Sequence, residues 1–256
     1  MRLVDTHAHL QSPQFADDLP DVLAAAELAG VERLLIPGWD ESSSGRAIEL
    51  VAAYPRLVAA AGIHPHAAAE TDEAGWDRTA ALALHPAVVA VGETGLDYDR
   101  LFSPVEDQLV NLRRNLALAV ALGKPAILHC RSAVGRRDAQ EDLLAEMRAA
   151  GFGGVASRAA FGDRPPAVLH SVCGPTDYVA AALELGCAVS VSGLCFRKGE
   201  EATAESVRLV PADRLLVETD APYLSAPGAP RRRNEPAWVR ITAAWVAEQR
   251  DRKSVV

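Results

Sequence analysis

The sequence predicts an α/β protein with a (β/α)8 TIM barrel fold, and three observations support this prediction. Apolar segments rich in Val, Ile and Leu alternate with segments whose apolar residues recur at helical spacing. Several of the apolar segments end directly at a His, Glu or Asp, as the catalytic strands of a parallel barrel do. The chain has 256 residues, of which 49% are hydrophobic and 5% aromatic. One barrel domain filled by small aliphatic side chains has about this length, so we expect a single domain over residues 1–256.

The expected strands and helices follow one another in a regular order. Short apolar runs with β-branched residues predict strands at 2–4, 31–36, 57–63, 87–91, 125–128, 167–169, 188–191 and 215–217. Apolar residues at helical spacing predict helices at 19–29, 41–54, 75–84, 104–122, 139–150, 177–185 and 235–250. Gly30, Gly123 and Gly151 follow three of these helices and Pro55 follows a fourth, as is usual at helix ends.

One segment does not fit the alternation of strands and helices. Residues 152–166, between an expected helix and the sixth strand, are rich in Gly, Ala, Arg and Pro. Connections from a helix to the next strand lie on the face of a barrel away from the site. We therefore expect this segment to be a tolerated loop insertion.

The main alternative to a barrel is an open, doubly wound parallel sheet. Such a sheet binds its ligand at a switch point and usually has a Gly-rich first loop. Here the first loop is Asp5-Thr6-His7-Ala8-His9, which has no glycine to bind a phosphate. The barrel is therefore favoured.

Composition and charge argue against several other classes of protein. No apolar run approaches the roughly 18 residues that a membrane helix requires. Asp5 and His7 lie where a signal peptide would have its apolar stretch, so we expect a cytoplasmic protein without membrane contact. The four cysteines have no close paired spacing, which argues against disulfides and against a thiolate zinc site. Because the formal charge is −8, a polyanion would have to bind through local positive charge or metal ions.

Side chains of metal-ligand type follow five of the expected strands. The six candidate metal ligands are His7, His9, Glu93, His129, His170 and Asp220. Side chains at positions i and i+2 of a strand lie about 6.6 Å apart on the same side, so His7 and His9 can bind one cation. A lone His-x-His pair is more often structural. The ligands at four other strand ends favour the metal site here.

These six side chains are enough for two divalent metal ions. Imidazole and carboxylate ligands suit zinc, manganese, iron or nickel better than calcium. We take Mg²⁺, Mn²⁺ and Zn²⁺ as the candidate ions. Glu93 lies on the middle strand of the set and is the candidate bridge between the ions. Water bound to a metal has a pKa near about 7 and supplies hydroxide at neutral pH. The pattern therefore predicts a metal-dependent hydrolase.

Seven motifs in order make the chain resemble the TatD-type metal-dependent deoxyribonucleases, a branch of the amidohydrolase-like metallo-TIM barrels. The resemblance covers nearly the whole chain. The motifs are Asp5-Thr6-His7-Ala8-His9, Gly62-Ile63-His64-Pro65, Gly92-Glu93-Thr94-Gly95-Leu96-Asp97-Tyr98, His129-Cys130-Arg131, His170-Ser171-Val172-Cys173-Gly174, Glu218-Thr219-Asp220-Ala221-Pro222-Tyr223-Leu224 and Arg233-Asn234-Glu235-Pro236.

The resemblance implies a fold, a ligand set and an activity. One metal ion would be held by His7, His9, Glu93 and Asp220, and the other by Glu93, His129 and His170. The implied activity is that of a divalent-metal phosphodiesterase, a deoxyribonuclease of the 3′–5′ exonuclease type that acts on DNA, with single-stranded ends as the expected partner. Metal-activated hydroxide would attack phosphorus in line.

Further residues are candidates for catalysis and for substrate contact. The resemblance implies that His64 faces the scissile phosphate, although a lone His in a Gly-x-His-Pro turn is more often structural. The candidate catalytic residues are Glu93, Asp220 and His64, with Asp220 orienting or deprotonating the water. The candidate substrate-binding residues are His64, Arg131 and Glu218. Arg131 suits a phosphate but could form a structural salt bridge, and Glu218 is expected beside the ligands rather than on the metal. We expect His66 and His85 to be non-catalytic.

Two other functions and one departure from the family remain open. Relatives on the same barrel cleave amides, lactones or phosphotriesters and often bridge their metals with a modified Lys on strand four, where this chain has Glu93. A non-nuclease partner in protein quality control is the other alternative, against which the full ligand set argues. The family usually continues through a further helix, whereas this chain stops at 252–256. A C-terminal helix region shortened in this way would expose apolar barrel surface.

Overall fold

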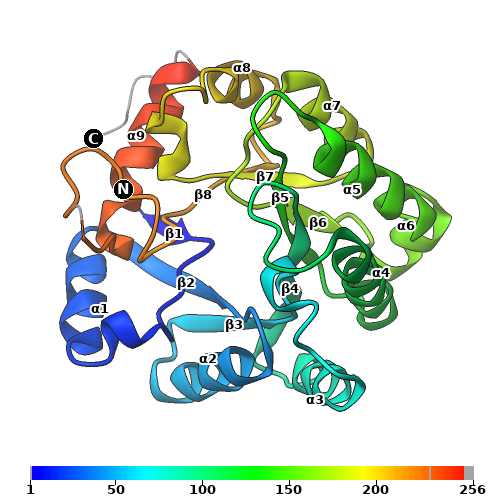
Figure 1. Cartoon of the computed structure of the whole chain (residues 1–256). Coiled ribbons are helices and arrows are strands. Elements are labelled where there is room, and N and C mark those ends of the chain that lie inside the picture. The colour runs from blue at the N-terminus through cyan, green and yellow to red at the C-terminus, as the bar shows by residue number, and fades with distance from the viewer. Residues whose placement is uncertain (1, 231, 251–256) are drawn as a thin grey trace.

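Eight parallel strands and the helices around them form a barrel in the computed structural model, which describes residues 2–230 and 232–250 (Figure 1). The strands are β1 (Leu3–Asp5), β2 (Val31–Pro37), β3 (Leu57–Ala61), β4 (Val88–Asp97), β5 (Ala126–Arg131), β6 (Ala167–Leu169), β7 (Ala188–Val191) and β8 (Leu215–Val217). Each strand pairs in parallel with the next one along the chain. The predicted TIM barrel is therefore confirmed.

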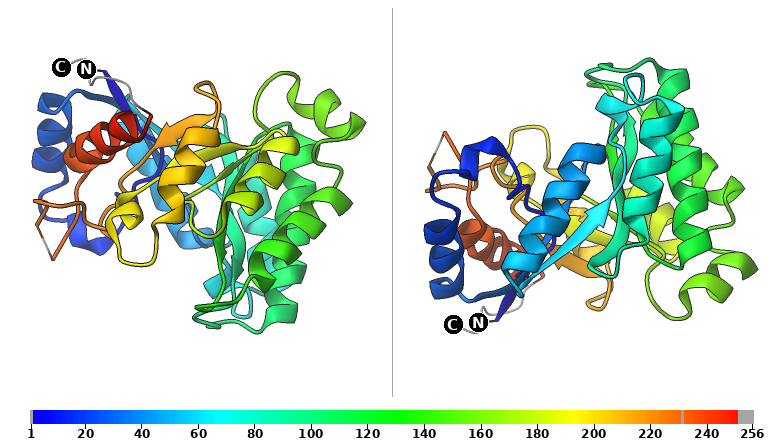
Figure 2. Two further views of the ribbon diagram at one scale, coloured as in Figure 1. Left: turned by 90° about the horizontal axis from the view of Figure 1, so that it is seen from above. Right: turned by 90° about the horizontal axis from the view of Figure 1, so that it is seen from below.

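Helices cover the outside of the barrel, as views from above and below show (Figure 2). They are α1 (Leu19–Leu28), α2 (Glu41–Ala53), α3 (Glu73–Ala83), α4 (Val105–Leu122), α5 (Asp138–Ala149), α6 (Val155–Phe161), α7 (Thr176–Glu184), α8 (Ala202–Leu209) and α9 (Val239–Gln249). Short 3-10 turns lie at Pro13–Phe15, Pro65–Ala67, Gly193–Phe196 and Pro236–Trp238. In the described part of the chain, none of the helices is both long and apolar enough to span a membrane.

Local side-chain chemistry fixes several helix ends. Before α2, the Asp40 carboxylate accepts the backbone N–H of Ser43 at 2.7 Å, and the Ser43 hydroxyl accepts the N–H of Asp40 at 3.0 Å. This reciprocal pair satisfies two of the amides that a helix leaves free at its start. Gly123 ends α4 with φ +60, in the left-handed region that glycine adopts at little energetic cost.

Two helices correct the sequence prediction. Residues 152–166 were expected to form a loop, but α6 lies within them and packs against α4. Helix α8, between β7 and β8, was not predicted. Its buried residues are Thr203, Ser206 and Val207, so two of the three are polar and its buried side is not an apolar run. Both helices have eight residues or fewer, and packing rather than an apolar pattern stabilises them.

Strand β4 continues six residues beyond its predicted end at Val91. Val91 pairs with Ala126 and Thr94 with Leu128, so β4 has one more residue than β5 over this stretch. Gly95, with φ +137, lies so close to β5 that a Cβ atom there would overlap the backbone oxygen of His129. The glycines of this segment therefore allow a bulged strand that carries Glu93 into the barrel.

One apolar side chain from each of five strands packs into a cluster inside the barrel. Ala60, Ala90 and Ile127 form this inner cluster together with Leu35 and Val168. Ile127 is two residues before His129, and Val168 is two residues before His170, so each pair faces the same side of its strand. The inner cluster thus lies directly below the polar residues at the carboxyl ends of the strands.

The barrel closes just beyond the ends of β1 and β8. The Thr6 N–H donates to the Val217 oxygen at 3.3 Å, and the Asp220 N–H donates to the His7 oxygen at 2.9 Å. The next bond in this series runs from the His9 N–H to the Ala221 oxygen, at 2.7 Å. Helix α9 lies against both strands. The prediction made for residues 252–256 falls outside the described residues.

Candidate metal centre

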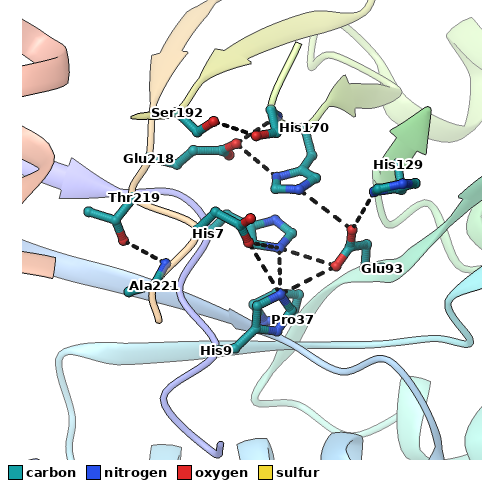
Figure 3. Close-up of polar contacts among 12 residues, drawn as sticks. His7, His9, Pro37, Glu93, His129, His170, Ser192, Glu218, Thr219 and Ala221 are labelled. Atoms are coloured by element: carbon teal, nitrogen blue, oxygen red, sulfur yellow. Dashed lines mark hydrogen bonds and ion pairs between the residues drawn. The ribbon is translucent and has the colours of Figure 1, made fainter. Parts of the chain in front are cut away.

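The six predicted ligands meet at the carboxyl ends of the strands, and Figure 3 shows His7, His9, His129 and His170 around Glu93. His7 and His9 follow β1, Glu93 lies in β4, His129 lies in β5, His170 follows β6, and Asp220 follows β8. All of them are buried except His129, which is partly exposed. The sequence predicted this convergence because ligands at the ends of parallel barrel strands share one face.

One group of four atoms has the spacing of a metal site. The Nε2 atoms of His7 and His9 are 3.2 Å apart, and they lie 3.2 and 3.5 Å from Glu93 Oε2. Asp220 Oδ1 is 3.7 Å from His7 Nε2 and 3.4 Å from His9 Nε2. Four donors held at about 2.0–2.2 Å from a tetrahedral cation lie about 3.3–3.6 Å from one another. The residues therefore fit a divalent cation.

The second oxygen of Glu93 faces a different set of side chains. Oε1 lies 3.3 Å from His129 Nδ1 and 3.5 Å from His170 Nε2. His64 Nε2 is equally near, at 3.4 Å. Each oxygen of one carboxylate thus faces its own group of nitrogen atoms, which is the arrangement a bridging carboxylate requires.

His64 differs from the other histidines in its hydrogen bonds. Its Nδ1 accepts the backbone N–H of His66 at 3.1 Å, so a neutral His64 carries its proton on Nε2. Burial lowers the pKa of His64 to about 4, which keeps the ring neutral. A protonated Nε2 donates a hydrogen bond and does not bind a metal. His64 is therefore suited to contact an anionic group in the pocket.

The charges in the centre favour bound cations. Burial alone would raise the pKa of Glu93, but the surrounding histidines hold it well below its usual range. Burial likewise opposes ionisation of Asp220, whereas a hydrogen bond from His9 and the charges of His170 and His7 lower its pKa. Two ionised carboxylates in a buried site need a positive partner, because an uncompensated buried charge is costly.

Glu218 lies behind the ligands. It is fully buried, its Oε1 accepts the Ser171 N–H at 2.6 Å, and the same oxygen lies 2.8 Å from His170 Nδ1. Burial would lower the pKa of His170, but the charges of Glu218 and Glu93 outweigh burial and raise it to about 10. Glu218 does not line the pocket, which corrects its expected role as a substrate contact. Its carboxylate instead orients the ring of His170.

Asp5 has a structural role that the sequence did not reveal. Its carboxylate accepts the Thr219 N–H at 2.9 Å, the Thr219 hydroxyl at 2.5 Å and the His7 N–H at 3.3 Å. Burial raises the pKa of Asp5 to about 7, although these hydrogen bonds act in the opposite direction. One side chain thus fixes both the His7 segment and the Asp220 segment. The only signal in the sequence was an acid two residues before His7.

His66 and Asp97 also lie beside the centre, and His66, which is expected to be non-catalytic, is within hydrogen-bond distance of Asp97. Asp97 Oδ2 lies 2.6 Å from His66 Nε2 and 3.5 Å from His129 Nε2. Asp97 Oδ1 accepts the N–H groups of Asp99 and Arg100. Asp97 therefore fixes the side of His129 that faces away from Glu93. His85, in contrast, is exposed after α3, as expected for a histidine outside the site.

A pocket of about 500 Å³ opens over the centre. His64, His129, Asp220 and Arg131 are among the residues that line it. The Arg131 side chain is 42% exposed and its Nε donates to Asp99 at 2.7 Å, so it forms a salt bridge while facing the pocket. Both roles considered for Arg131 are compatible with this position.

Comparisons with known proteins agree with this picture. Residues 4–255 match the family model described as TatD related DNase. The chain is 37% identical to the 3′-5′ ssDNA/RNA exonuclease TatD of Edwardsiella piscicida, over 97% of the chain and 92% of that protein. It is 32% identical to the uncharacterized metal-dependent hydrolase YabD of Bacillus subtilis, over 97% of the chain and 91% of that protein. The crystal structure of YjjV, a TatD homologue of Escherichia coli K12, superposes with a TM-score of 0.83 at 26% identity, covering 97% of this chain and 90% of that one.

Proposed function

Because the chain belongs to the TatD family of metal-dependent hydrolases, we propose that its site removes nucleotides from the 3′ ends of single-stranded DNA. The observation that carries this proposal is the Glu93 carboxylate, whose two oxygens face two separate groups of histidine nitrogens. Paired cations at such a carboxylate are suited to phosphodiester cleavage, in which both an attacking and a leaving oxygen carry charge.

In this proposal, six side chains hold the metal ions. His7, His9 and Asp220 would hold one divalent ion and His129 and His170 the other, and Glu93 would contribute one oxygen to each. When bound, the ions would lower the pKa of a water towards about 7 and offset the charge that develops on the phosphate. Mg²⁺, Mn²⁺ and Zn²⁺ are the candidates for both positions.

The side chains around the ions position the substrate and move the proton. Asp220, at the edge of the pocket, orients the attacking water and accepts its proton. The Nε2–H of His64 donates to a phosphate oxygen, which its hydrogen bond to His66 supports by fixing the proton on Nε2. Arg131 contacts a phosphate at the pocket wall, where its guanidinium can donate two hydrogen bonds.

The polymer, its polarity and the setting of the reaction are parts of the same proposal. The Edwardsiella relative is named for 3′-5′ action on single-stranded DNA and RNA, which supports an unpaired 3′ end as the substrate. We propose further that residues 1–256 act as one domain, supported by the single series of eight parallel strands and by the bond from Thr6 to Val217 between its two ends. A cytoplasmic location stays a prediction, which cell fractionation would check.

The test is an exonuclease assay on the purified protein. Single-stranded DNA, duplex DNA, RNA and a simple phosphodiester are each incubated with Mg²⁺, Mn²⁺ or Zn²⁺, with the label at the 5′ end or at the 3′ end. We expect a ladder of 5′-labelled products from single-stranded DNA and loss of activity in EDTA. Metal content is measured on protein prepared without chelators, and we expect two ions per chain.

A failure to cleave any phosphodiester with any of the ions would contradict the proposal. The same protein would then be tested on amides, lactones and phosphotriesters, which the lysine-bridged relatives of the barrel cleave. Activity on one of these would assign the centre to an amidohydrolase reaction. Inactivity on all of them, in protein that holds its ions, would favour a role outside catalysis.

A further inference from the structure

Two exposed aromatic rings line the pocket without belonging to the metal centre. Phe102 is 65% exposed and Tyr223 is 54% exposed, although both are large side chains. Phe102 lies in the connection between β4 and α4, and Tyr223 follows β8. Neither ring is buried in the core, so packing of the core does not explain why aromatic residues occupy these two positions. Exposed aromatic surface at the rim of a pocket is typical of a binding site.

The two rings lie near different groups of residues around Glu93. Phe102 packs edge-on against His66, with ring centroids 4.7 Å apart. His66 is in hydrogen-bond contact with Asp97, which lies beside His129. Phe102 is therefore next to the group of atoms that faces Glu93 Oε1. The Tyr223 ring lies 6.0 Å from the ring of His9, a residue of the group that faces Glu93 Oε2.

Positive charge accompanies the rings at the rim. Arg100, two residues before Phe102, lines the pocket, and Arg131 lines it from β5. Sites for single-stranded nucleic acid combine cationic side chains that follow the phosphates with aromatic rings on which bases stack. A base pair in a duplex offers no free face except at the helix end, since its neighbours cover it. An unpaired end can offer the faces of two successive bases.

We propose that Phe102 and Tyr223 are stacking platforms for the two nucleobases on either side of the scissile phosphate. This inference rests on the proposed nuclease function and specifies its substrate as an unpaired nucleic acid end. The phosphate lies over Glu93, and the terminal base and its neighbour lie against different rings. Stacking tolerates all four bases, because every base has a planar face. The site therefore selects single strands without selecting sequence.

The test is a set of double-mutant cycles between ring and base. Phe102→Ala and Tyr223→Ala are combined with single-stranded oligonucleotides that have an abasic residue at the 3′ end or at the position before it. On the ordinary oligonucleotide we expect each variant to lower kcat/KM by about fivefold or more, mainly by raising KM. A fivefold loss corresponds to the lower end of the free energy of one base stacking contact. Removing the base that stacks on the missing ring should then have no further effect.

Matched controls separate stacking from other effects. Phe102→Trp and Tyr223→Phe keep an aromatic face and should retain kcat/KM within about twofold. Leu84→Ala removes another exposed apolar side chain, 64% exposed at the far end of the barrel after α3, and should have no effect. Circular dichroism checks that each variant is folded.

The outcomes distinguish base stacking on the two rings from the nuclease function on which it rests. If each ring couples to a different one of the two bases, the platforms are supported. Coupling of both rings to the same base, or of neither ring to any base, would overturn the inference while leaving the nuclease function intact. Wild-type protein that cleaves neither ordinary nor abasic oligonucleotides would instead contradict the proposed function.

Discussion

Glu93 links the two halves of the candidate metal centre at the scale of one residue. Its Oε2 is within 3.5 Å of the nitrogens of His7 and His9, and its Oε1 is within 3.5 Å of those of His129 and His170. The side chain is 3% exposed, so solvent cannot replace its contacts. A change at this position should therefore affect both ion positions.

Glu93→Ala should abolish divalent-dependent hydrolysis, with a loss of at least about a thousandfold, because transition-state charge stabilisation by metal ions contributes several kcal/mol. Activity is measured on single-stranded DNA and metal content on the same preparation. Glu70→Ala, at an exposed position, is the matched control and should behave as wild type. Undiminished activity in folded Glu93→Ala protein would contradict the assignment of Glu93 as the carboxylate shared by the two ions.

Glu218→Gln tests a residue that acts through His170. The amide keeps the size of the side chain but loses the charge next to His170 Nδ1, 2.8 Å away. We expect metal affinity or activity to fall by about 10- to 100-fold, as for other residues that orient a metal ligand. Competition with a chelator measures the affinity, and Glu49→Gln on exposed α2 surface serves as the control. Equal affinities in the two variants would show that Glu218 does not orient His170.

Strand β4 shows how a single element positions the centre. Its ordinary register with β5 ends at Val91, and the glycines that follow bring Glu93 to the inside. Gly95 combines φ +137 with a backbone oxygen of β5 in the place of a Cβ. The glycine is therefore required by both conformation and space.

Gly95→Ala should destabilise the protein by about 3 kcal/mol or more, because the new methyl group strains the backbone and displaces β5. Gly45→Ala, in the middle of α2, is the contrasting change, since a Cβ there has open space around it. That variant should gain up to about 1 kcal/mol from helix propensity. Urea unfolding measures both free energies. A Gly95→Ala protein as stable as wild type would refute the tight contact with β5.

At the scale of the whole molecule, the centre depends on how the barrel closes. Asp5 and Thr219 are 214 positions apart in the chain, yet the Asp5 carboxylate accepts both the N–H and the hydroxyl of Thr219. The segments joined in this way carry His7, His9 and Asp220. The contacts that close the barrel therefore also bring His7 and His9 together with Asp220.

Thr219→Val tests this closure. Valine has nearly the same shape but leaves the buried Asp5 Oδ2 without its hydroxyl donor, so we expect a loss of about 1–3 kcal/mol in the free energy of unfolding. Thr176→Val is the control, because the Thr176 hydroxyl makes an exposed contact of 3.4 Å and its loss should have an effect within about 0.5 kcal/mol. Thermal or urea unfolding compares the two. Equal stabilities would show that the Asp5 contact contributes nothing to closure.

Most of the fold could be predicted from the sequence because local residue patterns indicate most of the strands and helices. Eight apolar runs correspond to the eight strands, and the long helix α4 has buried residues at helical spacing, among them Leu112, Leu116 and Ala119. Helices α6 and α8 were missed because they are short and owe their stability to neighbours far away in the sequence. The extension of β4 was missed because its glycines resemble a loop rather than a strand.

The order of residues along the chain is enough to predict which side chains of ligand type follow the strands, since it fixes what comes after each apolar run. It thereby indicated a metal-dependent hydrolase of the TatD family, which the comparisons confirm. The folded barrel is needed to show that Asp97 and His66 lie beside His129, that Glu218 contacts His170, and that Asp5 joins β1 to the segment after β8. These contacts depend on distances across a closed barrel, and such distances are set by the packing of the whole molecule rather than by any local pattern of residues.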